Sequence, residues 1–231
     1  MTSCSQARAL AEGAVEVHEL ADLGEVLDPQ VHLASWTRPV DDRISDLARR
    51  TAEHLGRDSR VILRYGVDGL RDEVAALIPE EAWAHDEAAA EAWRDDVVRH
   101  CEAFAELLQA EDLMVSFEGP EERTCPRFHV DRVGVRMLVT YSGPGTEWLA
   151  DADVDRARLG EAGQDLPDDQ NGVMRPGAVI RSVAPFAVTL LKGEAWPGAE
   201  GFGAVHRSPD PGGAPRALLR VDMLSQQKPR D

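Results

Sequence analysis

Apolar residues recur at helical spacing through much of the first half of the chain. The segments 41–59, 69–80 and 80–112 each show this spacing, which places their apolar side chains on one face of a helix. Between the first two segments, residues 59–66 have the pattern of a short strand. The pattern therefore predicts a mainly helical segment over residues 1–112.

The longest of these segments, 80–112, has aromatic residues in its apolar stripe, among them Trp83, Trp93 and Phe104. Aromatic side chains on one face of a helix are more often a packing surface than a ligand site. We therefore expect the helices to pack on the outside of the rest of the domain, and to bury Trp83 or Trp93 together with Phe104.

The pattern changes near residue 113. Short apolar runs follow, separated by Gly, Pro and Asp, and this alternation indicates β-strands joined by turns. Helices followed by strands are typical of an α+β domain. The runs cover residues 113–119, 127–131, 135–143, 178–183, 186–193, 201–208 and 216–224.

One long connection interrupts the β region. The stretch 149–172 is acidic and rich in turn residues, and it is either a surface loop or a cover over a site. We predict a single domain over residues 1–231, consisting of a helical flank (1–112), a β region that carries the site (113–224) and a frayed tail (225–231).

Composition narrows the class of function. The chain has 231 residues, 43% of them hydrophobic, which suffices for a packed core. Its formal net charge of −17 argues against nucleic acid or a membrane surface as partner, because both bind cationic surfaces. We find no signal-peptide pattern, no apolar run that would span a membrane, and no disulfide framework among the three cysteines. We expect a cytoplasmic protein that acts on a small molecule or a protein.

The run 127–131 carries the first candidate for chemistry. His129 and Asp131 lie two residues apart, and side chains at that spacing on a strand point to the same face. In a chain with seven histidines, such a pair also arises by chance on a polar strand face. A third ligand is needed to favour a metal site.

His206 is the only histidine that follows His129 in the sequence. It lies in the strand-like run 201–208, just before a turn rich in Pro and Gly. Two imidazoles and one carboxylate suit Fe(II), Mn(II) or Zn(II), and they leave coordination positions open. We predict that His129, Asp131 and His206 converge on one metal ion.

This order of residues, with Arg216 in the next strand-like run, resembles the Fe(II)- and 2-oxoglutarate-dependent oxygenases. The resemblance covers residues 113–224 and implies a double-stranded β-helix fold, which is jelly-roll and cupin-like. It implies that the three predicted ligands hold Fe(II), and that the substrate lies in the mouth of the barrel.

The same resemblance implies a binding site for the cosubstrate. Arg216 would pair with the remote carboxylate of 2-oxoglutarate, a task that suits a bidentate guanidinium. Arg220 is the reserve candidate on the same strand face. Tyr141, or Thr140 beside it, would supply a second contact to the cosubstrate.

A second resemblance covers nearly the whole chain. The runs VHLASWTRP, CPRFHVD, YSGPGTEWL and VHRSP are similar to those of a bacterial family known as domain of unknown function 1826. Genes of that family are often associated with zinc-homeostasis loci, so this resemblance points to metal handling.

Three functions therefore stay open: an oxygenase, a non-catalytic metal-binding protein of zinc homeostasis on the same β-scaffold, and a cupin-like binding module without metal. Cys125 bears on the second, because a thiolate beside His129 and His206 favours zinc; otherwise Cys125 is a small apolar residue. Arg216 separates the first two functions, because only the oxygenase needs a cation beside the metal.

The run 141–149 has two interpretations as well. Gly143 and Gly145 build a tight turn with Trp148 packed beneath it, or else Thr146 and Glu147 reach the site and contact substrate or the groups around the metal.

Overall fold

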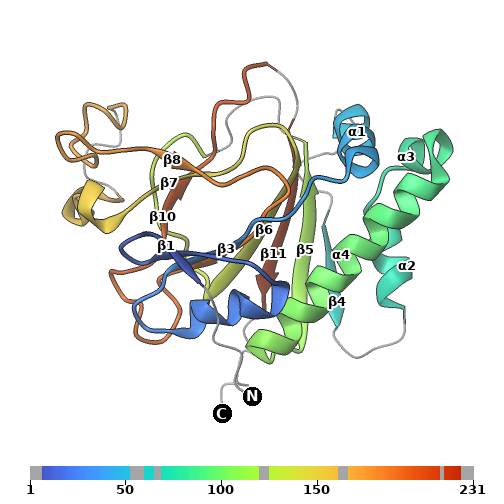
Figure 1. Ribbon diagram of the computed structural model, residues 1–231, viewed down its shortest axis with the longest axis horizontal. Coiled ribbons are helices and arrows are strands. Elements are labelled where there is room, and N and C mark those ends of the chain that lie inside the picture. Colours follow the sequence, from blue (N-terminus) through green and yellow to red (C-terminus); the bar gives the residue numbers. More distant parts are fainter. Residues whose placement is uncertain are drawn as a thin grey trace, which may run out of the picture.

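The computed structural model describes residues 7–52, 60–64, 69–119, 125–160, 166–213 and 216–224. In this part of the chain, helices cover one face of a large β-sheet (Figure 1) and a small sheet lies over its other face. The fold is thus mixed α+β. The predicted tail, 225–231, lies outside the described residues.

The larger sheet contains eight strands in the order β1-β2-β3-β9-β6-β11-β5-β4. Neighbouring strands pair antiparallel, except that β2 and β3 are parallel. The strands are β1 (Arg8–Ala11), β2 (Ala14–Val17), β3 (Leu33–Trp36), β4 (Arg60–Arg64), β5 (Asp112–Glu118), β6 (Val135–Ser142), β9 (Val188–Lys192) and β11 (Ala217–Met223).

The smaller sheet and the helices complete the described part of the fold. The smaller sheet has the order β10-β7-β8, formed by β7 (Glu147–Leu149), β8 (Arg181–Ser182) and β10 (Val205–Arg207). The helices are η1 (Leu20–Leu27), α1 (Asp42–Thr51), α2 (Leu70–Ala75), α3 (Glu80–His85), α4 (Glu87–Leu108), η3 (Asp151–Asp153) and η4 (Arg156–Arg158).

The predicted helical flank needs two corrections. Residues 8–36 supply β1, β2 and β3 at one edge of the larger sheet, and β3 pairs with β9. Local periodicity could not show this pairing, because the partner strand lies far away in the sequence. The single helix predicted over 80–112 is α3 and α4, because Asp86 is extended (φ −153°) and caps α4 by accepting a hydrogen bond from the Ala89 amide at 3.0 Å.

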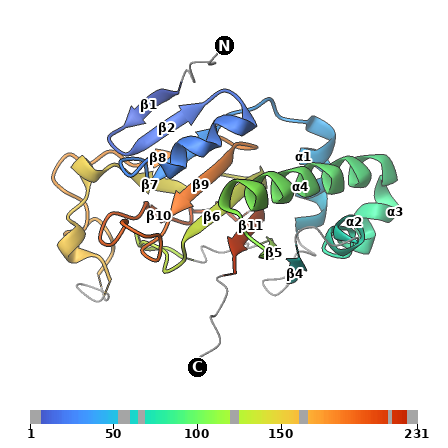
Figure 2. The same ribbon diagram turned by 90° about the horizontal axis from the view of Figure 1, so that it is seen from below.

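Helix α4 lies along the outer face of the larger sheet (Figure 2). Trp93 is fully buried there, with its ring centroid 5.0 Å from that of Phe117 and 5.5 Å from that of Tyr141. Phe104 is buried in the same cluster, whereas Trp83 is only partly buried. Edge-on aromatic contacts of this kind hold a helix layer onto a sheet.

The two faces of the sheet are chemically different, and β6 shows the alternation. Val135, Met137, Val139 and Tyr141 belong to the core beneath the helices. The residues between them point to the opposite face, where Leu138 packs with the smaller sheet. Because side chains alternate along a strand, this register decides which residues of β6 can belong to a site between the sheets.

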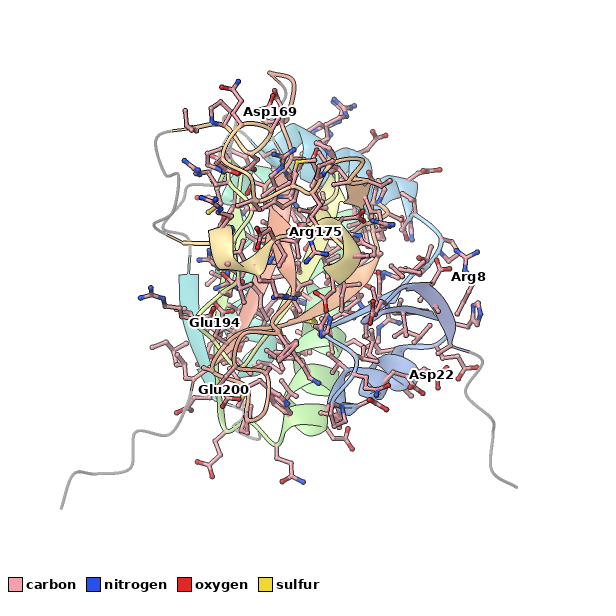
Figure 3. The ribbon with its side chains drawn as sticks, turned by 90° about the vertical axis from the view of Figure 1, so that its left-hand side faces the viewer. Arg8, Asp22, Asp169, Arg175, Glu194 and Glu200 are labelled. Atoms are coloured by element: carbon pink, nitrogen blue, oxygen red, sulfur yellow. The ribbon has the colours of Figure 1, made fainter. Side chains whose placement is uncertain are left out.

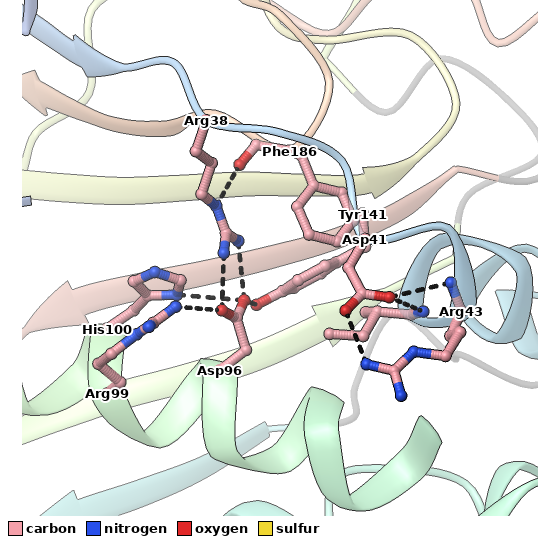
Figure 4. A network of polar contacts seen from close by, with 9 residues as sticks. Arg38, Asp41, Arg43, Asp96, Arg99, His100, Tyr141 and Phe186 are labelled. Atoms are coloured by element: carbon pink, nitrogen blue, oxygen red, sulfur yellow. Dashed lines mark hydrogen bonds and ion pairs between the residues drawn. The ribbon is translucent and has the colours of Figure 1, made fainter. Parts of the chain in front are cut away.

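A buried polar network also joins the helices to the sheet (Figure 4). Arg38, which follows β3, donates to both carboxylate oxygens of Asp96 on α4, at 2.6 and 2.7 Å. The Tyr141 hydroxyl donates to the same carboxylate at 2.9 Å. Charge-assisted bonds of this kind fix α4 in one register on the sheet.

Residues 149–160 and 166–172 lie beside the smaller sheet, on the side that faces the viewer in Figure 3, and the exposed residues Asp169 and Arg175 lie on that side. Residues 161–165 are outside the described part of the chain. Asp168 turns inward, is buried, and accepts a hydrogen bond from the Phe128 amide at 3.1 Å. The stretch therefore packs against the segment that carries His129. None of the described helices is both long and apolar enough to cross a membrane.

Candidate metal centre

His129 and His206 lie side by side because their backbones pair. The amide of each donates to the carbonyl of the other at 3.0 Å, as an isolated antiparallel bridge. Residues that exchange both backbone bonds present their side chains on the same face, and the two ring centroids are 4.6 Å apart. The strand predicted over 127–131 is thus reduced to this one bridge.

Backbone carbonyls orient both imidazole rings. Nδ1 of His129 donates to the carbonyl of Arg127 at 2.9 Å, and Nδ1 of His206 donates to the carbonyl of Ala204 at 3.0 Å. Because a carbonyl only accepts, each Nδ1 carries the proton, and the lone pair of each Nε2 is free to bind a metal.

Asp131 completes the group. Its Oδ1 lies 3.6 Å from Nε2 of His129, and its Oδ2 lies 3.3 Å from Nε2 of His206. Ligand atoms from the three residues all lie within 4.8 Å of one another. Atoms that bind one ion at about 2.0–2.2 Å are separated by distances of this order, so the structure brings the three predicted ligands together.

The charge and hydrogen bonding of Asp131 fit a cation. Burial raises the pKa of its carboxyl, but contacts with His129 and His206 and the charge of Arg136 outweigh burial and hold the pKa well below its ordinary value. Arg136 Nη1 forms an ion pair with Oδ2 at 2.8 Å, yet no described residue gives this buried oxygen a hydrogen bond. An anionic oxygen in that condition is suited to binding a metal ion.

Arg216 lies in the same pocket as the two histidines. Only 2% of the residue is exposed, and its Nη2 donates to the hydroxyl oxygens of Thr140 and Thr146, both at 2.9 Å. Among the described residues, its buried Nε has no hydrogen-bond partner, and the guanidinium forms no ion pair with a carboxylate. Burial lowers the pKa of this guanidinium to about 10. The charge of Glu118 offsets part of this burial, but a buried cation without a close ion pair still fits an anionic ligand.

The other two residues predicted to contact the cosubstrate, Arg220 and Tyr141, lie in different environments from Arg216. Arg220 lines the pocket, but its Nη1 already pairs with Glu118 at 2.7 Å. Tyr141 is fully buried on the outer face beneath α4, where its hydroxyl donates to Asp96. The predicted contact of Tyr141 with the cosubstrate is therefore wrong. Thr140, its neighbour, points to the pocket side and holds Arg216.

The run 141–149 combines both interpretations given to it. Gly143 has φ +87°, and a Cβ there would lie 3.3 Å from Arg216, so the turn packs directly on that side chain. Trp148 is buried in the core between the sheets. Thr146 lines the pocket and accepts a hydrogen bond from Arg216. The turn therefore positions the arginine.

Arg207 is a pocket residue that the sequence did not indicate. A residue next to a predicted ligand on a strand is expected to face away from it. In the structure, Arg207 binds Glu147 at 2.6 Å and the buried Asp168 at 2.8 Å. Its adjacency to His206 was the available signal, and alternation argued against using it.

The pocket that joins these residues has a volume of about 50 Å³, which is room for a few water molecules. Cys125 lies on its lining and is exposed. Among the described residues, Cys125 is not part of the group whose ligand atoms converge. The geometry thus supports two histidines and a carboxylate without the thiolate.

The comparisons with known proteins concern the family and the fold. The model of a family described as "Protein of unknown function (DUF1826)" matches residues 18–222. No curated protein matches the chain.

Several solved structures are similar to it. An N-substituted L-amino acid dioxygenase from Burkholderia ambifaria has 12% identity and a TM-score of 0.49, over 98% of this chain and 97% of that one. Dioxygenase for auxin oxidation 1 from Arabidopsis thaliana, in complex with 2-oxoglutarate, has 9% identity and a TM-score of 0.48, over 94% and 93%. A prolyl-4-hydroxylase from Pseudomonas putida has 14% identity and a TM-score of 0.45, over 96% and 100%.

Proposed function

We propose that this protein is an Fe(II)- and 2-oxoglutarate-dependent oxygenase on a double-stranded β-helix. The chain belongs to the DUF1826 family, as its sequence predicted. One observation carries the proposal. A buried arginine without a carboxylate partner shares a pocket with two histidines whose Nε2 atoms face Asp131.

The residues fit Fe(II) as the metal. His129, Asp131 and His206 offer two nitrogen atoms and one oxygen, and such a set leaves coordination positions open for a cosubstrate and oxygen. Iron bound there with 2-oxoglutarate would supply the oxidising chemistry. The chain itself holds the ligands in place through the Arg127 and Ala204 carbonyls.

Arg216 supports the cosubstrate. Thr140 and Thr146 hold its Nη2, while its Nε is left for a ligand oxygen. A guanidinium that is fixed before binding loses little rotational freedom when it pairs with a carboxylate. The remote carboxylate of 2-oxoglutarate would supply the direct ion pair that Arg216 lacks among the described residues.

The size of the pocket favours a second candidate, a non-catalytic zinc-handling protein. A pocket of about 50 Å³ is smaller than a dicarboxylate, so a pocket side chain has to move before 2-oxoglutarate can enter. A zinc ion needs no such movement, and two histidines with one carboxylate also suit zinc.

The deciding experiment measures metal and cosubstrate together. Protein purified without added metal is analysed for bound metal, and is then titrated anaerobically with Fe(II) and 2-oxoglutarate while the visible charge-transfer band is recorded. Arg216→Ala should weaken 2-oxoglutarate binding by about 30-fold or more, because a desolvated bidentate pair is lost, and should leave metal content unchanged.

Three further variants complete the test. Arg216→Lys should rescue binding only in part, since an ammonium cannot reproduce the guanidinium fork. Arg220→Ala is the matched control, and should leave 2-oxoglutarate affinity within about threefold because Arg220 is already paired. His129→Ala should abolish binding of both metal and cosubstrate. Tight metal binding by the wild-type protein, without 2-oxoglutarate binding that depends on Arg216, would reject the oxygenase and support zinc handling.

A further inference from the structure

A second cavity lies on the opposite face of the larger sheet from the metal centre. It has a volume of about 510 Å³ and lies between η1 and the C-terminal half of α4; η1 lies next to the C-terminal end of α4 in Figure 2. Met137 and Leu190 contribute from the sheet, and Leu23, Phe104 and Leu107 contribute from the helices. This size and apolar lining are typical of sites for small molecules.

One buried polar side chain interrupts the apolar lining. His100 on α4 lines the cavity and is completely buried, yet neither of its ring nitrogens makes a hydrogen bond with a described residue. Buried polar groups in folded proteins nearly always have a partner. An imidazole with an unsatisfied ring nitrogen on the wall of a large cavity points to a ligand.

The surroundings of His100 define which atom is free. Its Nδ1 lies 3.5 Å from Oδ2 of Asp96 (Figure 4), and Arg38 and Tyr141 already donate to that carboxylate. Burial holds the pKa of His100 at about 3, so the ring is neutral with one N–H. Because Nδ1 faces a carboxylate, the proton belongs on Nδ1, and Nε2 is the acceptor left without a hydrogen bond. Since Nε2 is fully buried, a neighbouring side chain of the lining has to shift before a ligand reaches it.

We propose that this cavity binds a neutral, largely apolar small molecule whose single hydroxyl group donates a hydrogen bond to Nε2 of His100. The apolar lining disfavours a charged ligand, because no counter-charge inside the cavity would offset its desolvation. The exposed Glu106 on the lining adds repulsion against anions. The site is independent of the proposed oxygenase activity, since its lining residues and those of the metal pocket do not overlap.

The test compares two probes of nearly equal shape, 2-naphthol and 2-methylnaphthalene, by calorimetric titration of the full chain. The first carries the hydroxyl donor and the second does not. We expect 2-naphthol to bind about tenfold more tightly, the effect of one buried hydrogen bond. In the wild-type protein, the ¹⁵N resonance of His100 Nε2 should shift with 2-naphthol and stay unchanged with 2-methylnaphthalene. The anion 2-naphthoate should not bind.

Two variants locate the site. His100→Leu should bind both probes with equal affinity, because the acceptor is gone and the apolar lining remains. Ala103→Trp should abolish binding of both, since Ala103 lines the cavity and an indole would fill it. Ala88→Trp is the control, at an exposed position of the same helix, and should bind as the wild type does.

The proposal would be overturned by no binding of 2-naphthol up to its solubility limit, by equal affinity of the wild type for both probes, or by binding that persists in Ala103→Trp. Concentration-dependent dimerisation that Ala103→Trp abolishes would show that a second copy of the chain covers the cavity, and would overturn it too. If His100→Leu does not fold, the ¹⁵N measurement on the wild type decides.

Discussion

The two faces of the larger sheet differ most clearly at two adjacent residues of β6. Thr140 points toward the candidate metal pocket and accepts a hydrogen bond from Arg216. Tyr141 points the other way, is buried beneath α4, and donates to Asp96. One peptide bond thus separates a residue that positions a candidate cosubstrate anchor from a residue that fixes the helix layer.

The outer face derives its stability from apolar contact. Trp93, Phe117, Tyr141 and Phe186 form a chain of edge-on ring contacts there. The inner face is rich in charges that are already paired, such as Arg136 with Asp222 at 2.7 Å. Burial of apolar rings is strongly stabilising, whereas buried ion pairs add little net stability. Changes on the outer face should therefore affect folding, and changes on the inner face should affect binding.

The largest effect is expected for Trp93→Ala on the outer face. Trp93 is fully buried, so its removal should lower the free energy of unfolding by about 5 kcal/mol, near the upper end for this type of substitution. Urea denaturation followed by circular dichroism measures the change. Trp83→Ala, at a half-buried position, is the control and should cost clearly less; equal losses would contradict the central role of Trp93.

Asp96→Asn should have the next largest effect. Asp96 is the carboxylate partner of Arg38, and both side chains are almost fully buried, so the substitution strands a buried guanidinium. We expect a loss of about 3 kcal/mol in the free energy of unfolding. The neighbouring Asp95 pairs with Arg71 but has a side chain that is 50% exposed, and Asp95→Asn should cost less than about 0.5 kcal/mol. Similar losses at the two positions would show that burial of the network is unimportant.

His100 should give the outer face a pH dependence. Burial, partly offset by the charge of Asp96, lowers the pKa of the folded-state imidazole to about 3, against an ordinary 6.5. As the pH falls from 6.5 toward 3, the unfolded chain binds a proton that the folded chain does not. The free energy of unfolding should therefore decrease by up to about 1.4 kcal/mol per pH unit.

Denaturation at several pH values between 6.5 and 4.5 measures this slope. His100→Leu should reduce it, because the variant has no imidazole to protonate in the unfolded state. His85→Gln, at an exposed position of α3, is the control and should keep the slope of the wild type. An unchanged slope in His100→Leu would mean that the folded protein accepts the proton on His100.

Local patterns predicted the parts of the fold that local interactions determine. The apolar stripe of α4 and the alternation of β6 are both legible in the sequence. The candidate metal ligands could be named because His129 and Asp131 have strand spacing, and His206 is the sole later histidine. The strands β1, β2 and β3 were missed, because β3 depends on pairing with the distant β9, and β2 and β1 then pair onto β3 in turn.

Tyr141 shows an error that alternation could have prevented. Val135, Met137 and Val139 share its parity in β6 and are apolar, whereas Arg136 and Thr140 have the opposite parity. This parity would have placed the tyrosine on the apolar face, with its hydroxyl bound inside the core, instead of at the cosubstrate. No local pattern could predict the hydrogen bonds that hold Arg216. One of them goes to Thr146, which lies far from Arg216 in the sequence.

The smallest predicted effect concerns stability on the inner face, and it has the opposite sign from those on the outer face. Arg216 is a buried cation without a carboxylate partner among the described residues, and burial lowers its pKa to about 10. Removal of such a charge relieves desolvation, and binding sites commonly retain groups that destabilise the free protein. Arg216→Ala should therefore raise the free energy of unfolding of the metal-free protein by about 1 kcal/mol.

Arg220→Ala should lower the free energy of unfolding, because Glu118, 7% exposed, loses its partner. Urea denaturation of both variants side by side measures the two signs. If Arg216→Ala destabilised the protein as much as Arg220→Ala does, Arg216 would be a structural cation, and the contrast between the two faces would not extend to it.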